Sequence, residues 1–124
     1  ETAMTAYVLQ GLLTARAAGL AVPDSLTSRG MAFLEKAFAR ESNLHELSYA
    51  GYVLTLDPRR AAAAGKRLLT VVYPAREKLS PYGLALLTLA LDRAGSRAEA
   101  RICLENLENG AKVEPAYGTV SWTR

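Results

Sequence analysis

The chain has 124 residues, a formal net charge of +3 at pH 7 and one cysteine, and half of its residues are hydrophobic. This length fits one domain or part of one, and the composition is typical of globular rather than disordered proteins. The uncharged runs are shorter than the ~20 residues that a membrane-spanning helix needs. One cysteine excludes an internal disulfide, and the mild, dispersed charge predicts no nucleic-acid partner.

Two helices are predicted over about residues 3–40. Gly19 is expected to stop the first helix after Ala18, and Asp24 or Ser25 is expected to cap the second. The second helix has one apolar stripe at helical spacing, which we expect to be buried. The residues of this stripe are Leu26, Gly30, Phe33, Leu34 and Ala37.

A second pair of helices is predicted over about residues 45–72 and a third over about 81–109. Asp57 and Ser80 are each followed by a proline, and an N-cap residue followed by proline is a common helix start. Gly95 is expected to end the fifth helix. The expected buried stripe of the fourth helix is Ala61, Ala64, Leu68, Leu69 and Val72.

The sixth helix is predicted to begin at a cap, Ser96, and to end near Gly110. The tail over residues 111–124 has no helical period. Within it, Gly118–Trp122 favours a short extended segment, with Trp122 expected to anchor the tail by packing. No other span alternates at period two, so no larger sheet is predicted.

Inner and outer helices can be told apart by their polarity. The first, third and fifth helices are apolar on nearly every face, whereas the second, fourth and sixth are amphipathic. A helix that is apolar all round must be covered on all sides, and an amphipathic helix on one side only. The alternation therefore predicts an all-α fold with two concentric layers, in which three αα-hairpins form part of an α/α toroid or a solenoid.

Several segments resemble one family. Ser48–Leu54, and Leu79–Leu87 followed by Asp92–Gly95, look like parts of the thioester-containing domain of the alpha-2-macroglobulin family. Thr5–Leu9 is similar to a helix opening that follows the reactive site in that family, and Val120–Trp122 to a later tryptophan segment. The resemblance implies an α/α toroid like that of terpenoid cyclases and protein prenyltransferases. A family domain has about six hairpins, so residues 1–124 would be roughly half of one.

The resemblance also implies a function for the parent protein, a broad-range protease inhibitor that collapses around a protease after cleavage of a bait segment. The family's Cys-Gly-Glu-Gln thioester would precede this chain. We therefore expect a non-catalytic scaffold with no cofactor, and the partners would be target proteases and the remaining domains of the same chain. The alanine- and arginine-rich composition suggests a bacterial parent, which would be extracytoplasmic, in the periplasm or membrane-anchored there. The alternative is an αα-solenoid peptide-binding or adaptor module, and a more distant one is an enzyme on the toroid fold.

The segment Cys103–Asn106 superficially resembles the thioester motif. Its amide is the shorter asparagine, and Leu104 replaces the glycine that the tight ring requires. The segment also lies within an amphipathic helical pattern. We therefore interpret Cys103 as a small buried apolar residue rather than a reactive one.

Other candidate site residues favour structural interpretations. His45 has no second histidine or cysteine at ligand spacing, so no zinc site is assigned and an exposed position is expected. Asp24, Asp57 and Asp92 all fall at helix ends, where capping and solvation explain them. Arg59, Arg60, Lys66 and Arg67 make the fourth helix basic, and a solvated outer face explains this better than a nucleic-acid patch.

Four tyrosines fall on the three inner helices. They are Tyr7, Tyr49, Tyr52 and Tyr82. We expect them to pack in the core with their hydroxyls turned to polar partners. A ligand site in the middle of the toroid is the alternative.

The ends of a partial ring would lack neighbouring helices. Each uncovered Leu or Val forfeits roughly 1.5–3 kcal/mol of burial. We therefore expect the 124-residue chain to self-associate with rising concentration through the apolar face that carries Val8, Leu12, Leu84 or Leu87.

Overall fold

The structure is a computed structural model that describes residues 2–114 and 119–122. The helices are α1 (Thr2–Ala17), α2 (Asp24–Arg40), α3 (Leu44–Thr55), α4 (Ala61–Arg67), a π-helical turn η1 (Leu68–Val72), a 3₁₀ helix η2 (Tyr73–Lys78), α5 (Pro81–Arg93) and α6 (Arg97–Gly110). The strands β1 (Ala111–Glu114) and β2 (Thr119–Trp122) pair antiparallel. The all-α prediction is confirmed, and the described part of the predicted extended segment is β2. In these ranges no helix combines the length and the apolar character needed to span a membrane.

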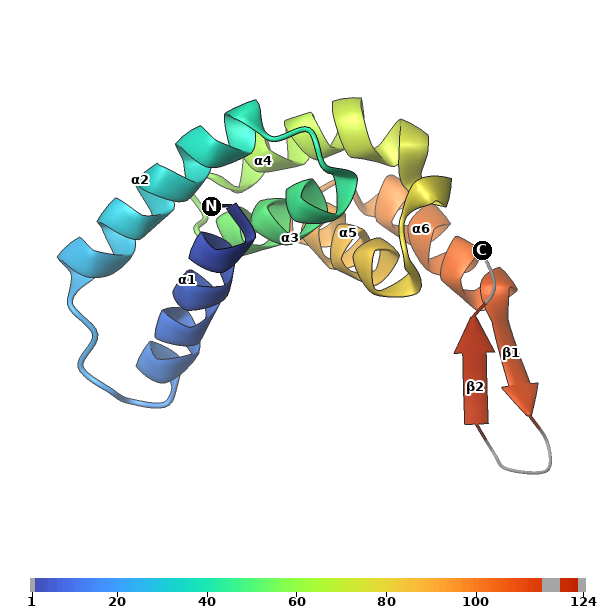
Figure 1. The fold of residues 1–124 in the computed structure, drawn as a ribbon, viewed down its shortest axis with the longest axis horizontal. Helices are drawn as coiled ribbons and strands as arrows, with labels where there is room; N and C mark the ends of the chain where they lie inside the picture. Colours follow the sequence, from blue (N-terminus) through green and yellow to red (C-terminus); the bar gives the residue numbers. More distant parts are fainter. Residues whose placement is uncertain (1, 115–118, 123–124) are drawn as a thin grey trace.

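The helices form two layers that curve into an arc (Figure 1). The inner layer consists of α1, α3 and α5, and α3 contacts both of its inner neighbours. Each of α2, α4 and α6 packs against the inner helix that precedes it in the chain. One end of the arc is formed by α1 with α2, and the other by α5 with α6, from which the β-hairpin extends (Figure 1).

The inner helices are covered to different degrees. In α3, most residues between Leu47 and Thr55 are buried, and the buried hydroxyl of Ser48 donates to the Leu44 carbonyl oxygen at 2.9 Å. Helix α5 is also largely buried, whereas α1 buries only Thr2, Ala6 and Leu9. Helix α1 lies at one end of the arc and is the least covered of the three, which agrees with the expectation that the ends of a partial ring lack neighbouring helices.

Some of the predicted cap and stop residues are found at the helix ends, and others are not. The Ser80 hydroxyl accepts the Gly83 N–H at 3.1 Å and so caps α5. Gly19 and Gly95 adopt φ values of 96° and 91°, the left-handed conformation in which glycine ends helices. Asp24 does not cap α2. It is the first helical residue and follows Pro23, which has no side-chain capping bond.

Two further helix starts differ from the prediction. Ser96 precedes α6 but makes no side-chain capping bond. Helix α4 begins at Ala61 rather than Pro58, because residues 57–60 form a turn in which the Asp57 carbonyl oxygen accepts the N–H groups of Arg60 and Ala61. The predicted fourth helix then changes to the π-helical η1 at Leu68, a change that no sequence signal indicates.

The buried face of α2 is not the predicted one. The buried residues are Thr27, Met31, Leu34 and Phe38. Leu26 and Phe33 of the predicted stripe are 41% and 57% exposed. Both sets recur at helical spacing and share Leu34, so the sequence pattern alone could not choose between them. The correct face is the one that α1 and α3 cover.

The expected self-association face needs a similar correction. Leu84 and Leu87 are fully buried in the core and cannot contact another molecule. Val8 is about half exposed, and Leu12 is half-buried. Apolar side chains are exposed at both ends of the arc, but at α5 and α6 they are different residues from those predicted.

Candidate functional site

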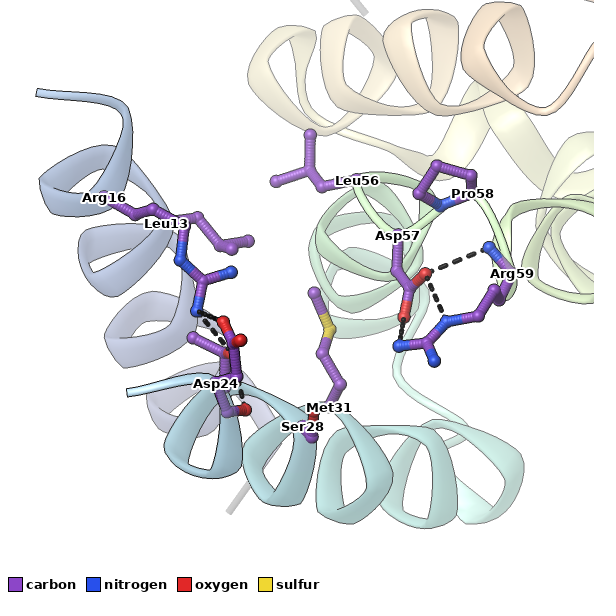
Figure 2. A pocket seen from close by; sticks show the side chains of 10 residues that line it. Leu13, Arg16, Asp24, Ser28, Met31, Leu56, Asp57, Pro58 and Arg59 are labelled. Carbon is purple, nitrogen blue, oxygen red and sulfur yellow. Dashed lines mark hydrogen bonds and ion pairs between the residues drawn. The ribbon is translucent and has the colours of Figure 1, made fainter. Parts of the chain in front are cut away.

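A cleft of about 380 Å³ opens between the C-terminal half of α1, the start of α2 and the turn between α3 and α4 (Figure 2). Leu13, Met31 and Leu56 supply the apolar part of its lining. The polar part comes from Arg16, Asp24, Thr27, Ser28, Asp57 and Arg59, with Pro58 beside them. The cleft thus brings together two of the three aspartates that the sequence analysis considered, one on each side.

On one side of the cleft, Arg16 ties α1 to α2. Its Nη2 donates to Asp24 Oδ1 at 3.0 Å, to Thr27 Oγ1 at 2.9 Å and to the Val22 carbonyl oxygen at 3.3 Å. The Asp24 carboxylate is otherwise almost wholly exposed. The contact therefore fixes the linker between two helices, and sequence reasoning missed it because the partners lie eight residues apart across a turn.

On the other side, Asp57 is held as a carboxylate. Burial raises the pKa of this group, but hydrogen bonds from the Arg59 backbone N–H, at 3.0 Å, and from the guanidinium groups of Arg59 and Arg60 outweigh burial, so the pKa is lowered. A carboxyl group that stays ionised cannot serve as a general acid near neutral pH. Each carboxylate of the cleft has an arginine partner, so the charges of its lining cancel.

The predicted basic outer face is partly used inside the fold. Arg60 pairs with Asp57 and with Glu35 of α2, and Arg67 donates to the Phe38 and Glu41 carbonyl oxygens. The Arg67 guanidinium also lies over the Phe38 ring, 5.7 Å from its centroid. Two of the four basic residues, Arg60 and Arg67, therefore connect the α4 segment to α2 instead of only facing solvent.

Cys103 is fully buried in α6, as expected. Burial raises the pKa of its thiol to about 11, with an opposing effect from Arg76 and a further increase from Glu99. The thiol is therefore protonated and shielded at physiological pH. Among the described residues, no group of three or more His, Cys, Asp or Glu side chains is placed to hold a metal ion.

We expect the Cys103 thiol of the folded chain to resist alkylation until the pH approaches about 11, whereas the chain in denaturant should react from about 9. The unfolded thiol loses its proton first, so this residue's contribution to stability falls as the pH rises between these values. Iodoacetamide labelling followed by mass spectrometry measures the reaction. Rapid labelling of the native chain at mildly alkaline pH would contradict the buried assignment.

The only histidine has a structural role that the sequence did not predict. His45 is exposed as expected, but its Nε2 accepts the Ser80 N–H at 2.8 Å. This bond joins the start of α3 to the start of α5. Asp92 is an exposed residue in the last turn of α5, 4.0 Å from the Arg97 Nε.

Tyr7 on α1, Tyr49 on α3 and Tyr82 on α5 come from three adjacent inner helices, and we call them the tyrosine row. The Tyr49 hydroxyl donates to Gln10 Oε1 at 2.7 Å. Burial raises the pKa of the Tyr49 hydroxyl, and electrostatic interaction with Tyr82 and Tyr7 raises the pKa further. The expected core packing is wrong for Tyr7 and Tyr82, which are each 68% exposed. Tyr52 packs against the core, and the Trp122 side chain lies outside the part of the chain described.

Comparison with protein-family models, curated proteins and solved structures finds no significant match.

Proposed function

We propose that the chain is a non-catalytic scaffold within the α/α-toroid, thioester-type domain of an alpha-2-macroglobulin-like protease inhibitor. The observation that carries the proposal is the exposure of apolar side chains at both ends of a two-layer helical arc. A soluble helical protein normally covers such surfaces. In a toroid, further hairpins would cover both ends.

At the first end, a groove of about 230 Å³ runs between α1 and α2. Its lining is mostly apolar and includes Met4, Val8, Leu12 and Leu26, with Thr5 as a polar member. At the other end, a groove of about 420 Å³ lies between α5 and α6 and is lined by Tyr82, Ala85, Leu104 and Leu107, among others. Each groove lies between an inner and an outer helix, where a neighbouring hairpin of the same kind would pack.

The proposed partners and location are those of the parent protein. Target proteases would contact the assembled inhibitor, and the remaining domains of the parent would contact the ends of the arc. The parent would be a bacterial protein outside the cytoplasm, in the periplasm or membrane-anchored there. The mutual pairing of Asp57 with Arg59 and Arg60 and the buried Cys103 thiol support a structural rather than a reactive role for this part.

The test uses the natural protein that contains this sequence, isolated with antibodies raised against residues 1–124. After incubation with a protease, we expect cleavage outside these residues, retention of the protease in the complex and slower hydrolysis of large protein substrates. Methylamine should add no mass within residues 1–124. A parent protein that neither retains nor slows any of several proteases would contradict the proposal, as would amine incorporation at Asn106 with release of a thiol.

A second candidate, an αα-solenoid module that binds peptides, is favoured by the tyrosine row. Tyr7 and Tyr82 expose amphipathic rings on the two helices that pack against the helix of Tyr49, and tyrosine is enriched in protein-binding surfaces. An array of random decapeptides would test this function. Binding that is lost on replacing both exposed tyrosines by alanine would favour the solenoid, and no binding would favour the scaffold.

A further inference from the structure

The chain contains three asparagines, and only one of them precedes a glycine. Asn109 is followed by Gly110 at the end of α6, whereas Asn43 and Asn106 are each followed by leucine. The backbone nitrogen of glycine can approach a neighbouring group more closely than that of a residue with a Cβ atom. We propose that Asn109 is a modification site, at which attack by the Gly110 nitrogen removes the side-chain amide without an enzyme.

The reaction closes a cyclic imide from the groups of these two residues. The Gly110 nitrogen forms a bond to Asn109 Cγ, and the bond between Cγ and Nδ2 breaks. Nδ2 leaves as ammonia, which carries away the proton of the Gly110 nitrogen. Water then adds to the imide and opens it at one of its two carbonyl groups. The products are aspartate and isoaspartate, and the isoaspartate main chain is longer by one methylene group. Water is the co-reactant, and nothing is oxidised or reduced.

The structure distinguishes Asn109 from the other two asparagines. Asn43 Oδ1 accepts the Glu46 N–H at 3.0 Å and so caps α3. Asn106 Oδ1 accepts a hydrogen bond from Arg76 Nε at 2.9 Å. Asn109 is exposed, and no hydrogen-bond partner of its side-chain amide lies among the described residues. The Asn109 side chain is therefore the one that can turn toward the following backbone nitrogen.

The position at the end of α6 allows the ring to close. Within a helix, each backbone N–H is held in a hydrogen bond to an earlier carbonyl oxygen. Residues 109 and 110 are the last two of α6, and the next residue, Ala111, is already extended and donates its N–H to the Glu108 carbonyl oxygen. The terminal turns of helices open far more often than their centres. The Gly110 nitrogen therefore becomes free to react while the core stays folded.

The reaction would change both the charge and the backbone at the end of α6. A carboxylate at position 109 lies next to Glu108 and four residues after Glu105, and the last turn of α6 holds no basic side chain. Like charges at this spacing, and negative charge at a helix C-terminus, both destabilise a helix. Isoaspartate also lengthens the main chain where α6 passes into β1. We therefore expect the last turn of α6, which packs Leu107 against the core, to be loosened.

Incubation of the folded 124-residue chain at mildly alkaline pH, followed by digestion and mass spectrometry, measures the reaction. Asn109 should be converted to aspartate and isoaspartate, whereas Asn43 and Asn106 in the same digest should stay intact. Gly110→Ala should react about ten-fold or more slowly, because the added Cβ hinders the approach of the nitrogen. Circular dichroism verifies that this variant folds. An Asn109 that reacts in denaturant but stays intact in the folded chain would overturn the proposal, as would an undiminished reaction in Gly110→Ala.

The effect on α6 is measured with two variants that add the same charge. In Asn109→Asp, the amide hydrogens of residues 107–110 should exchange faster than in the unaltered chain, while those of residues 47–54 in α3 keep their protection. Asn106→Asp is the matched control, because its carboxylate meets the Arg76 guanidinium and should leave the exchange of residues 107–110 unchanged. Equal acceleration in both variants, or none in Asn109→Asp, would contradict the proposed loosening of the last turn.

Discussion

Replacing Leu87 by alanine is expected to lower the free energy of unfolding by roughly 2–5 kcal/mol, the usual cost of removing a fully buried leucine side chain. Leu87 lies on α5 with no exposed surface, within the core cluster that joins the inner and outer layers. The loss combines forfeited burial with the cavity left behind. Urea denaturation followed by circular dichroism measures the change.

Leu89 provides the matched control, because it lies two residues away on the same helix and is 51% exposed. Leu89→Ala should change the free energy of unfolding by less than about 1 kcal/mol, since little packing is lost and alanine favours helix formation. Equal losses at the two positions would show that α5 does not face the core as described.

Replacing Gly65 by alanine is expected to destabilise the fold by about 1–3 kcal/mol through overpacking. A Cβ atom at this position in α4 would lie 2.4 Å from the Cβ of Ala94, at the end of α5. Because a methyl group attached directly to the backbone cannot rotate away, the two segments would have to separate. The effect opposes the usual gain of alanine over glycine within a helix, and thermal or urea denaturation gives its sign.

The control is Gly11→Ala in α1, where an added Cβ meets no atom within 4 Å. This change should stabilise the chain by about 0.5–1 kcal/mol, because glycine loses more backbone freedom on folding than alanine. Stabilisation at both positions would contradict the close approach of α4 to Ala94.

Much of the fold could be predicted because the local signals agree with the tertiary structure. Gly19 and Gly95 end helices where only glycine adopts the left-handed conformation at little cost. Ser80 caps α5 and Pro81 is its first residue, and this start signal also depends only on neighbouring residues. In contrast, the buried face of α2 depends on which neighbours cover it, and two overlapping apolar stripes, one with Phe33 and one with Phe38, left that choice open.

The site could be predicted less well, because its contacts join separate parts of the chain. Arg16 meets Asp24 only because the linker reverses the chain direction, and Arg60 reaches Glu35 across 25 residues. Asp57 was expected to cap a helix that in the structure begins only at Ala61, and its two arginine partners depend on the turn over residues 57–60. The exposure of Tyr7 and Tyr82 was also not predicted, because an apolar inner helix at the end of an arc looks the same in sequence as one at the centre.

The central claim is that α3 and α5 are covered inner helices, whereas α1, at one end of the arc, is left partly uncovered. Amide hydrogen exchange of the dilute 124-residue chain tests this claim most directly. The described burial predicts the slowest exchange in the segments 47–54 and 84–91, and markedly faster exchange along α1, although its sequence is equally apolar. Protection of α1 equal to that of α3, or early exchange throughout α5, would contradict the two-layer arc with open ends.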